Sequence, residues 1–143
     1  MNIIIGSDHA GYDLKEVCKA HLLQSGEHRV TDVGVFSRDS SDYPRIAKEV
    51  AGAVSRGEYD RGVLICGSGI GMSITANRFK RVRAALCHDV YSAKMSRLHN
   101  DANILAMGGR IVGPGVALEI LEVFLKTEFE GGRHKKRLDL IDD

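Results

Sequence analysis

The chain has 143 residues, of which 43% are hydrophobic and 27% are charged. These are the proportions of a globular domain, and they exclude disordered and collagen-like proteins. Lys and Arg number 20 and Asp and Glu number 19, so the formal net charge is +1 and the basic footprint of a nucleic-acid-binding domain is absent.

The apolar runs, the first residues and the cysteines indicate the compartment. No apolar run approaches the ~20 residues of a membrane helix, and the N-terminal segment lacks the basic and apolar regions of a secretory signal peptide. Cys18, Cys66 and Cys87 have no paired spacing, which is typical of a reducing compartment. We therefore expect one soluble, cytoplasmic domain over residues 1–143, with no membrane and no nucleic-acid partner.

Short apolar runs alternate with amphipathic stretches along the chain. The runs predict buried strands over residues 2–6, 28–34, 61–66, 82–87 and 102–109. Apolar residues at helical spacing predict helices near residues 14–22, 44–54, 71–77, 90–98 and 114–124, and a basic helix at about 131–141. Gly26, Pro44 and Asp89 stand where a C-terminal glycine, a first-turn proline and an N-cap belong. We expect His21 and Val116 to lie on the buried faces of their helices.

Strands and helices that alternate with short connections predict parallel strands joined by right-handed crossovers. The strands are continuously apolar, which indicates that helices cover both faces of the sheet. The sequence thus predicts a Rossmann-like, three-layer α/β/α sandwich with a five-stranded parallel sheet. In such sheets ligands bind beyond the carboxyl ends of the strands, near the topological switch point.

Three strand ends carry residues suited to such a site: Gly6–His9, Cys66–Gly71 and Met107–Arg110. The glycines of the second segment bring backbone N–H groups close to a ligand, and the helix that follows favours negative charge. Their G-x-G-x-G spacing fits neither the dinucleotide fingerprint nor the P-loop. Met72 stands where a cysteine-based phosphatase loop has Arg. The loop therefore predicts an anion site outside the common nucleotide and phosphatase patterns.

Cys66 begins this loop, and a thiol at a helix N-terminus can act as a base or nucleophile near neutral pH. The alternative is a buried structural cysteine, the role we assign to Cys18 and Cys87. Among the histidines, His9 lies at a strand end, whereas His99 lies at a helix end where it can also serve as a cap. No Cys/His spacing resembles a zinc site, so we expect no metal.

The segment RHKKR at residues 133–137 offers two interpretations. Arg133 and Arg137 are four residues apart, share one helix face and suit a phosphate group. The alternative is a solvated basic tail. Nucleic-acid binding is disfavoured because the chain is nearly neutral and this run lacks interleaved aromatic residues.

Five motifs occur in one order over nearly the whole chain: GSDHAG (6–11), DYP (42–44), CGSGIGMSI (66–74), SRLHNDANILAMGGR (96–110) and EGGRHKKR (130–137). With them the chain resembles the B-type ribose-5-phosphate isomerases, within the ribose-5-phosphate and galactose-6-phosphate isomerase family. The resemblance implies a cofactor-free aldose–ketose isomerase. It also implies a homo-oligomer, dimer or tetramer, with active sites between subunits.

The resemblance also implies roles for particular residues. Cys66 matches the base that moves a proton between C1 and C2 of the open-chain sugar, and His99 the residue that opens the furanose ring. The loop that holds the enediolate oxygen matches Gly67, Ser68, Gly69 and Gly71. Groups near the sugar hydroxyls match Asp8, Tyr43 and Asn100, with Asp8 and Ser68 counted as catalytic. Phosphate ligands match His9, Arg110, Arg133 and Arg137.

Two alternatives stay open at this stage. One is isomerisation of a six-carbon sugar phosphate, such as allose 6-phosphate or galactose 6-phosphate. The galactose-6-phosphate relatives generally lack the His of the LHND motif, whereas His99 is present here. The other alternative is a non-catalytic nucleotide-binding module, against which Cys66, His99 and Arg137 argue together.

Overall fold

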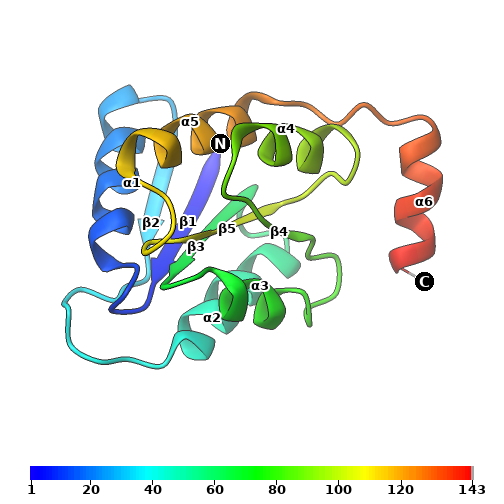
Figure 1. The fold of residues 1–143 in the computed structure, drawn as a ribbon. Helices are drawn as coiled ribbons and strands as arrows, with labels where there is room; N and C mark the ends of the chain where they lie inside the picture. Colours follow the sequence, from blue (N-terminus) through cyan, green and yellow to red (C-terminus); the bar gives the residue numbers. More distant parts are fainter. Residues whose placement is uncertain (143) are drawn as a thin grey trace.

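The computed structural model describes residues 1–142, and its elements alternate along the chain as strand and helix (Figure 1). The strands are β1 (Asn2–Ser7), β2 (Arg29–Asp32), β3 (Arg61–Cys66), β4 (Ala84–Leu86) and β5 (Ile104–Gly108). The helices are α1 (Tyr12–Ser25), α2 (Tyr43–Ser55), α3 (Ile70–Ala76), α4 (Val90–Leu98), α5 (Pro114–Lys126) and α6 (Arg133–Asp142).

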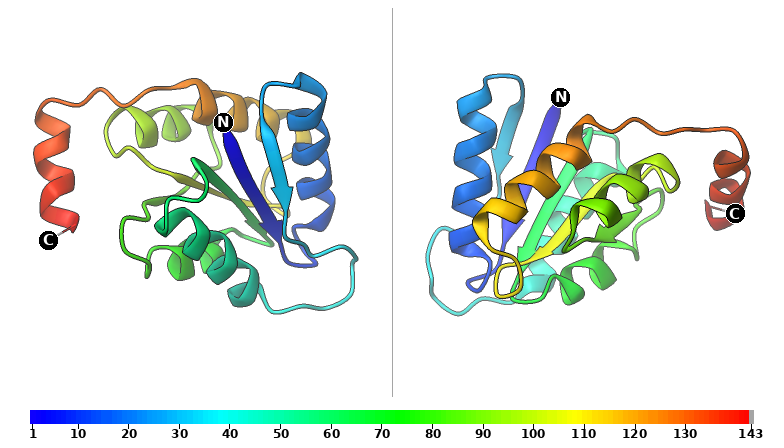
Figure 2. Two further views of the ribbon diagram at one scale, coloured as in Figure 1. Left: turned by 180° about the vertical axis from the view of Figure 1, so that it is seen from behind. Right: turned by 45° about the horizontal axis from the view of Figure 1, so that its top comes forward.

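The five strands form one parallel sheet in the order β2-β1-β3-β5-β4. Because side chains alternate across a strand, neighbours on β1 enter different cores. Ile3 and Ile5 pack with α1, α4 and α5 on one face, while Ile4 packs with α2 and α3 on the other. Figure 2 shows these two helical layers on either side of the sheet. The predicted three-layer α/β/α architecture is confirmed.

The capping signals act as the sequence predicts. Asp89 precedes α4 and accepts a hydrogen bond from the Ser92 backbone N–H at 2.6 Å. Pro44 lies in the first turn of α2, where its missing N–H costs nothing. Gly26 follows α1 in the left-handed conformation, with φ of 69°, which a residue with a Cβ adopts only with strain.

Two helix faces differ from the expectation. Val116 is 47% exposed on α5, and His21 is half-buried and pairs with Glu122 at 2.6 Å instead of entering the core. Lys15 takes the buried place on α1, and its ammonium group donates to both carboxylate oxygens of Asp32 at 2.8 Å. Helical periodicity alone assigns a lysine to the surface, because its partner lies on another element.

The sheet order sets where a ligand can bind. The chain leaves β1 toward β2 on one side, and it leaves β3 toward β5 and β4 on the other. The switch point is therefore between β1 and β3, whose carboxyl ends carry Asp8, His9 and Cys66.

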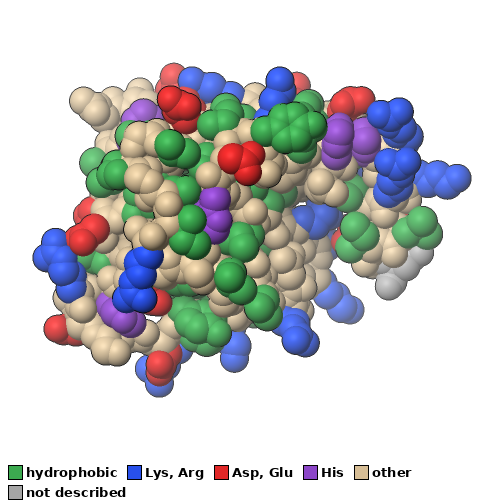
Figure 3. All heavy atoms as spheres, viewed as in Figure 1, with side chains coloured by type: hydrophobic (Ala, Val, Ile, Leu, Met, Phe, Trp, Pro, Cys, Tyr) green, Lys and Arg blue, Asp and Glu red, His purple; other side chains and the backbone are tan. Residues whose placement is uncertain are grey.

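Helix α6 stands to one side of the sheet, beyond an extended segment that follows α5 (Figure 1). It spans Arg133–Asp142, close to the predicted 131–141, and its basic side chains gather at the right edge of Figure 3. Within residues 1–142 no helix is long and apolar enough to cross a membrane.

Candidate active site

A pocket of about 630 Å³ opens at the switch point. Segments from three strand ends and from the starts of α2 and α3 line it: Asp8, His9, Ala10, Tyr43, Cys66, Gly67, Ser68, Ile70, Gly71, Ile74, Arg110 and Ile111. Eight of the residues predicted for the site are in this lining. The apolar members, Ile70, Ile74 and Ile111, were not predicted, because an isoleucine beside a strand end carries no chemical signal in the sequence.

The loop that follows β3 places Cys66 at the base of this pocket. The Gly69 backbone N–H donates to the Cys66 sulfur at 3.1 Å, and the Ile70 N–H donates to the Ser68 hydroxyl oxygen at 3.3 Å. The loop turns because Gly69 has a φ of 76°. A Cβ at Gly69 would lie 2.7 Å from the Met107 carbonyl carbon, so only glycine fits there. The sulfur thus accepts a hydrogen bond from one backbone amide of the loop.

The end of β5 closes the other side of the loop. The Gly109 N–H donates to the Cys66 carbonyl at 2.8 Å, and the Arg110 N–H donates to the Gly67 carbonyl at 3.0 Å. Arg110 is exposed, and within residues 1–142 its guanidinium has no carboxylate partner. A cation at the pocket rim is therefore available to an anionic ligand.

The β1 end supplies a carboxylate and an imidazole. Asp8 is buried, and its Oδ1 accepts a hydrogen bond from the Gly11 N–H at 3.0 Å. His9 is held by Ser41, whose backbone N–H donates to Nδ1 at 3.2 Å. Because Nδ1 accepts, the neutral ring carries its proton on Nε2, so His9 presents a donor. Tyr43 packs on Gly71, where an added Cβ would lie 2.5 Å from the ring.

The other two cysteines lie in the core, as predicted. Burial raises the pKa of Cys18 to about 12 and the pKa of Cys87 to about 11. Both stay protonated thiols at neutral pH and act as packing residues.

Gly69 belongs to the loop that carries the pocket but is not among the lining residues, and the other four predicted residues, His99, Asn100, Arg133 and Arg137, do not line the pocket either. His99 and Asn100 precede β5, whereas Arg110 follows it. The five-residue strand separates the two ends by about 16 Å, and the two arginines lie on α6, outside the sheet (Figure 1). Within one chain the predicted site is thus divided into a pocket group and a distal group, defined as these four residues.

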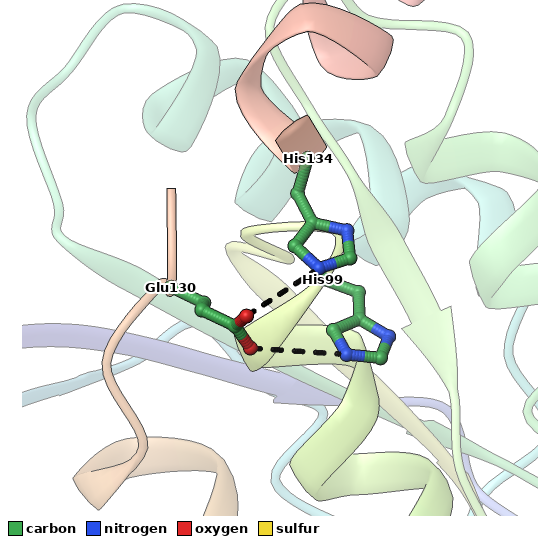
Figure 4. Close-up of side chains that lie close together, drawn as sticks. All are labelled: His99, Glu130 and His134. Carbon is green, nitrogen blue, oxygen red and sulfur yellow. Dashed lines mark ion pairs between the residues drawn. The ribbon is translucent and has the colours of Figure 1, made fainter. Parts of the chain in front are cut away.

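One member of the distal group, His99, contacts two residues that the sequence analysis did not single out. The His99 and His134 rings stack with centroids 4.2 Å apart, and Glu130 lies beside both (Figure 4). Burial and the neighbouring His99 lower the pKa of His134, which favours its neutral form. Glu130 and His134 lie four positions apart but more than 30 positions after His99. No local spacing in the sequence therefore marks the cluster.

The structure is an α/β protein with a thiol, backbone amides and a guanidinium that has no carboxylate partner among residues 1–142 gathered near its switch point, an arrangement suited to a small anionic ligand. Comparison with known protein families identifies the family. The chain belongs to the Ribose/Galactose Isomerase family, whose profile matches residues 3–141.

Named relatives and solved structures agree with this assignment. The chain is 48% identical over 139 residues to the ribose-5-phosphate isomerase B of Escherichia coli, covering 97% of this chain and 93% of that protein. It is 42% identical over 145 residues to a D-erythrulose-4-phosphate isomerase of Pectobacterium atrosepticum, covering 99% and 93%. The structure of the Clostridium thermocellum ribose-5-phosphate isomerase B superposes with a TM-score of 0.95 at 51% identity, covering 99% and 95%.

Proposed function

We propose that the protein is an aldose–ketose isomerase that interconverts ribose 5-phosphate and ribulose 5-phosphate. The observation that carries the proposal is the Cys66 sulfur in a pocket at the switch point, where it accepts a hydrogen bond from the Gly69 backbone N–H at 3.1 Å. The E. coli relative bears the name of this activity. The crystal structure of the ribose-5-phosphate isomerase B of Mycoplasma genitalium, 40% identical with a TM-score of 0.93 over 99% of this chain and 93% of that one, contains bound ribulose 5-phosphate.

The reaction moves one proton between carbons and one between oxygens. The Cys66 thiolate removes the proton from C2 of the open-chain aldose, and the C2–H electron pair forms the C1–C2 double bond of an enediolate. The same sulfur then returns the proton to C1, while the O2 proton moves to O1. The loop amides and the Ser68 hydroxyl stabilise the oxyanion, and Asp8 and Tyr43 hold the sugar hydroxyls. Since no electrons leave the sugar, the step is redox-neutral and needs no cofactor.

The phosphate gives the enzyme a remote handle on the substrate. His9 and Arg110 provide a donor and a cation at the pocket rim. Arg133, Arg137, Asn100 and the ring-opening His99 lie in the distal group, so we propose that they come from a second copy of the chain. Exposed Ile70, Ile74 and Ile111 beside the pocket supply apolar surface for such pairing.

A purified-protein assay tests the function. Turnover of ribose 5-phosphate should exceed turnover of allose 6-phosphate and of D-erythrulose 4-phosphate, measured side by side. Cys66→Ala should abolish turnover and leave the fold intact, because only one small side chain is lost. More than a few per cent of activity in this variant would show that Cys66 is not the base.

Ring opening has a test of its own. His99→Asn should slow ribose 5-phosphate turnover strongly and slow the reverse reaction of the acyclic ribulose 5-phosphate much less. Equal losses in both directions, corrected for the equilibrium constant, would assign His99 to another step.

The phosphate contacts can be tested on α6. Arg133→Ala or Arg137→Ala removes a charge-assisted contact worth about 1.5–3 kcal/mol, so kcat/KM should fall roughly ten- to hundred-fold. Lys136 is exposed on the same helix, and Lys136→Ala serves as the control. Equal small effects that vanish with added salt would identify α6 as a solvated tail.

A further inference from the structure

Outside the pocket, two imidazoles and a carboxylate converge where α4 ends and α6 begins. Nε2 of His99 is 4.0 Å from Oε2 of Glu130, and Nε2 of His134 is 3.8 Å from Oε1 of the same carboxylate. The coordinating atoms of the three side chains all lie within 4.8 Å of one another. Figure 4 shows both rings presenting these nitrogens to Glu130.

The backbone holds this cluster in place. The Glu130 N–H donates to the Leu98 carbonyl at 3.1 Å, which fixes Glu130 beside the residue that precedes His99. Gly131 and Gly132 then have φ of 72° and 55°, a left-handed turn that glycine allows. This turn brings His134 back over Glu130, and its N–H donates to the Gly131 carbonyl at 3.1 Å. Three segments are thus joined by main-chain contacts.

The buried nitrogen in this cluster lacks a partner. His134 is only 4% exposed, and its Nε2 makes no hydrogen bond within residues 1–142. A buried polar atom without a partner is costly. Its gap to Glu130 is too long for a hydrogen bond, whereas ligands on either side of a tetrahedral zinc ion lie about 3.3–3.5 Å apart, given bonds of about 2.0–2.2 Å. The two rings stack nearly parallel, at 13°, whereas a metal ion lies in the plane of each imidazole that binds it. Binding therefore requires the half-exposed His99 ring to turn out of the stack and the half-exposed Glu130 side chain to move by about half an ångström.

We propose that His99, Glu130 and His134 form a site for a divalent transition-metal ion, with zinc the best match. Two imidazoles and one carboxylate are a donor set that zinc accepts, and three protein ligands leave a fourth position open. A bound ion would link α4 to α6 and occupy the His99 nitrogen. Arg133 and Arg137, on the same segment, oppose a cation and keep the affinity modest. Because the ion would occupy the His99 nitrogen that the proposed function assigns to ring opening, we expect it to act as an inhibitor rather than as a cofactor.

The binding test needs no enzyme assay. Titration calorimetry with Zn²⁺ should show one ion per chain, and Co²⁺ should give a d–d spectrum without a thiolate charge-transfer band. Glu130→Gln, a change at a half-exposed side chain, should weaken binding at least about tenfold, because even outer partners of a metal site cost 10–100-fold. His134→Asn should do the same.

The control is a His–Glu pair without a third ligand. His21 contacts Glu122 at 2.6 Å on α1 and α5, and His21→Asn should leave Zn²⁺ affinity unchanged. Absence of binding, equal affinity in wild type and Glu130→Gln, or a thiolate band that assigns the ion to Cys66 would each overturn the proposal.

The consequences of binding are measured separately. Excess Zn²⁺ should raise the thermal midpoint of the wild type and not of Glu130→Gln, because only the ligated folded state gains free energy. Inhibition rests on the proposed function, and it should be stronger for ribose 5-phosphate than for ribulose 5-phosphate. If zinc binds and stabilises the protein but inhibits neither the forward nor the reverse reaction, the inhibitory role is refuted and the metal site itself is supported. A chain that binds zinc and turns over neither sugar would refute the proposed function alone.

Discussion

The division of the site over two ends of the sheet predicts that two inactive variants restore each other. Cys66→Ala damages the pocket group, and His99→Asn damages the distal group, about 16 Å of strand away. If each active site combines the pocket of one chain with the distal group of another, a mixed dimer contains one doubly damaged site and one intact site. Neither variant alone contains an intact site.

The expected magnitude follows from counting. Random pairing of equal amounts makes half of the dimers mixed, and each has one intact site of two, so the refolded mixture should recover about a quarter of wild-type activity. A mixed dimer purified through two different affinity tags should recover about half. The assay is ribose 5-phosphate turnover per mole of chain, compared with each variant refolded alone.

The control joins two variants of the same group. Cys66→Ala mixed with Arg110→Ala damages every pocket, so its activity should stay at the mean of the two parents. The Cys66→Ala and His99→Asn mixture could also show no gain in activity while size-exclusion chromatography confirms mixed dimers. Cys66 of one chain and His99 of the other would then not share an active site, and our inference from their separation would be wrong.

Three further predictions concern the frame around the pocket. Gly69→Ala should destabilise the fold by about 3 kcal/mol or more, since its Cβ would meet backbone at 2.7 Å. Gly26→Ala is the control, because Gly26 has a similar φ but open space around the added Cβ, and it should cost about 1 kcal/mol. Equal losses of unfolding free energy in urea denaturation would refute this. Iodoacetamide at neutral pH should label Cys66 alone, since burial raises the pKa of Cys18 to about 12 and the pKa of Cys87 to about 11. The label count is measured by mass spectrometry of the native protein, and labelling of a second cysteine would contradict this prediction. Asp32→Asn should cost up to about 3 kcal/mol, because the buried Lys15 loses its main carboxylate partner and keeps only the more exposed Glu16, at 3.2 Å. Burial acts to raise the pKa of Asp32, but hydrogen bonds from lysines outweigh it and lower the pKa. The free energy of unfolding that Asp32 contributes to the wild type should therefore be present above about pH 3.8 and be lost as the pH falls further. If the wild type and Asp32→Asn lose stability equally between about pH 5 and acid pH, the prediction is wrong.

The sheet and the pocket group could be predicted from the sequence because both depend on local signals. Apolar runs fix the strands, and parallel strands place their carboxyl ends at one edge. Asp8 follows β1 directly, Cys66 is the last residue of β3, and Arg110 comes two residues after the end of β5. Their meeting in one pocket therefore follows from the topology.

Contacts between elements could not be predicted in the same way. His134 lies in a basic run that reads as exposed, yet the turn at Gly131 and Gly132 and the stack on His99 bury it. The buried Lys15 likewise depends on Asp32, a residue of another element. Such burial is decided by partners distant in sequence, which periodicity does not contain.

The pocket wall around Cys66 has a consequence for changing the enzyme's substrate. The groups that donate hydrogen bonds to the Cys66 sulfur and to the Ser68 hydroxyl are the main-chain amides of Gly69 and Ile70, and a substitution can displace an amide N–H but cannot delete it. The apolar side of the lining is formed by the side chains of Ile70, Ile74 and Ile111 and the ring of Tyr43, so substitution can change its shape, within the limits that pairing with a second copy sets on the three isoleucines. We expect variants selected for a longer or shorter sugar phosphate to accumulate changes at these four positions, and a library limited to them samples most of the adjustable volume.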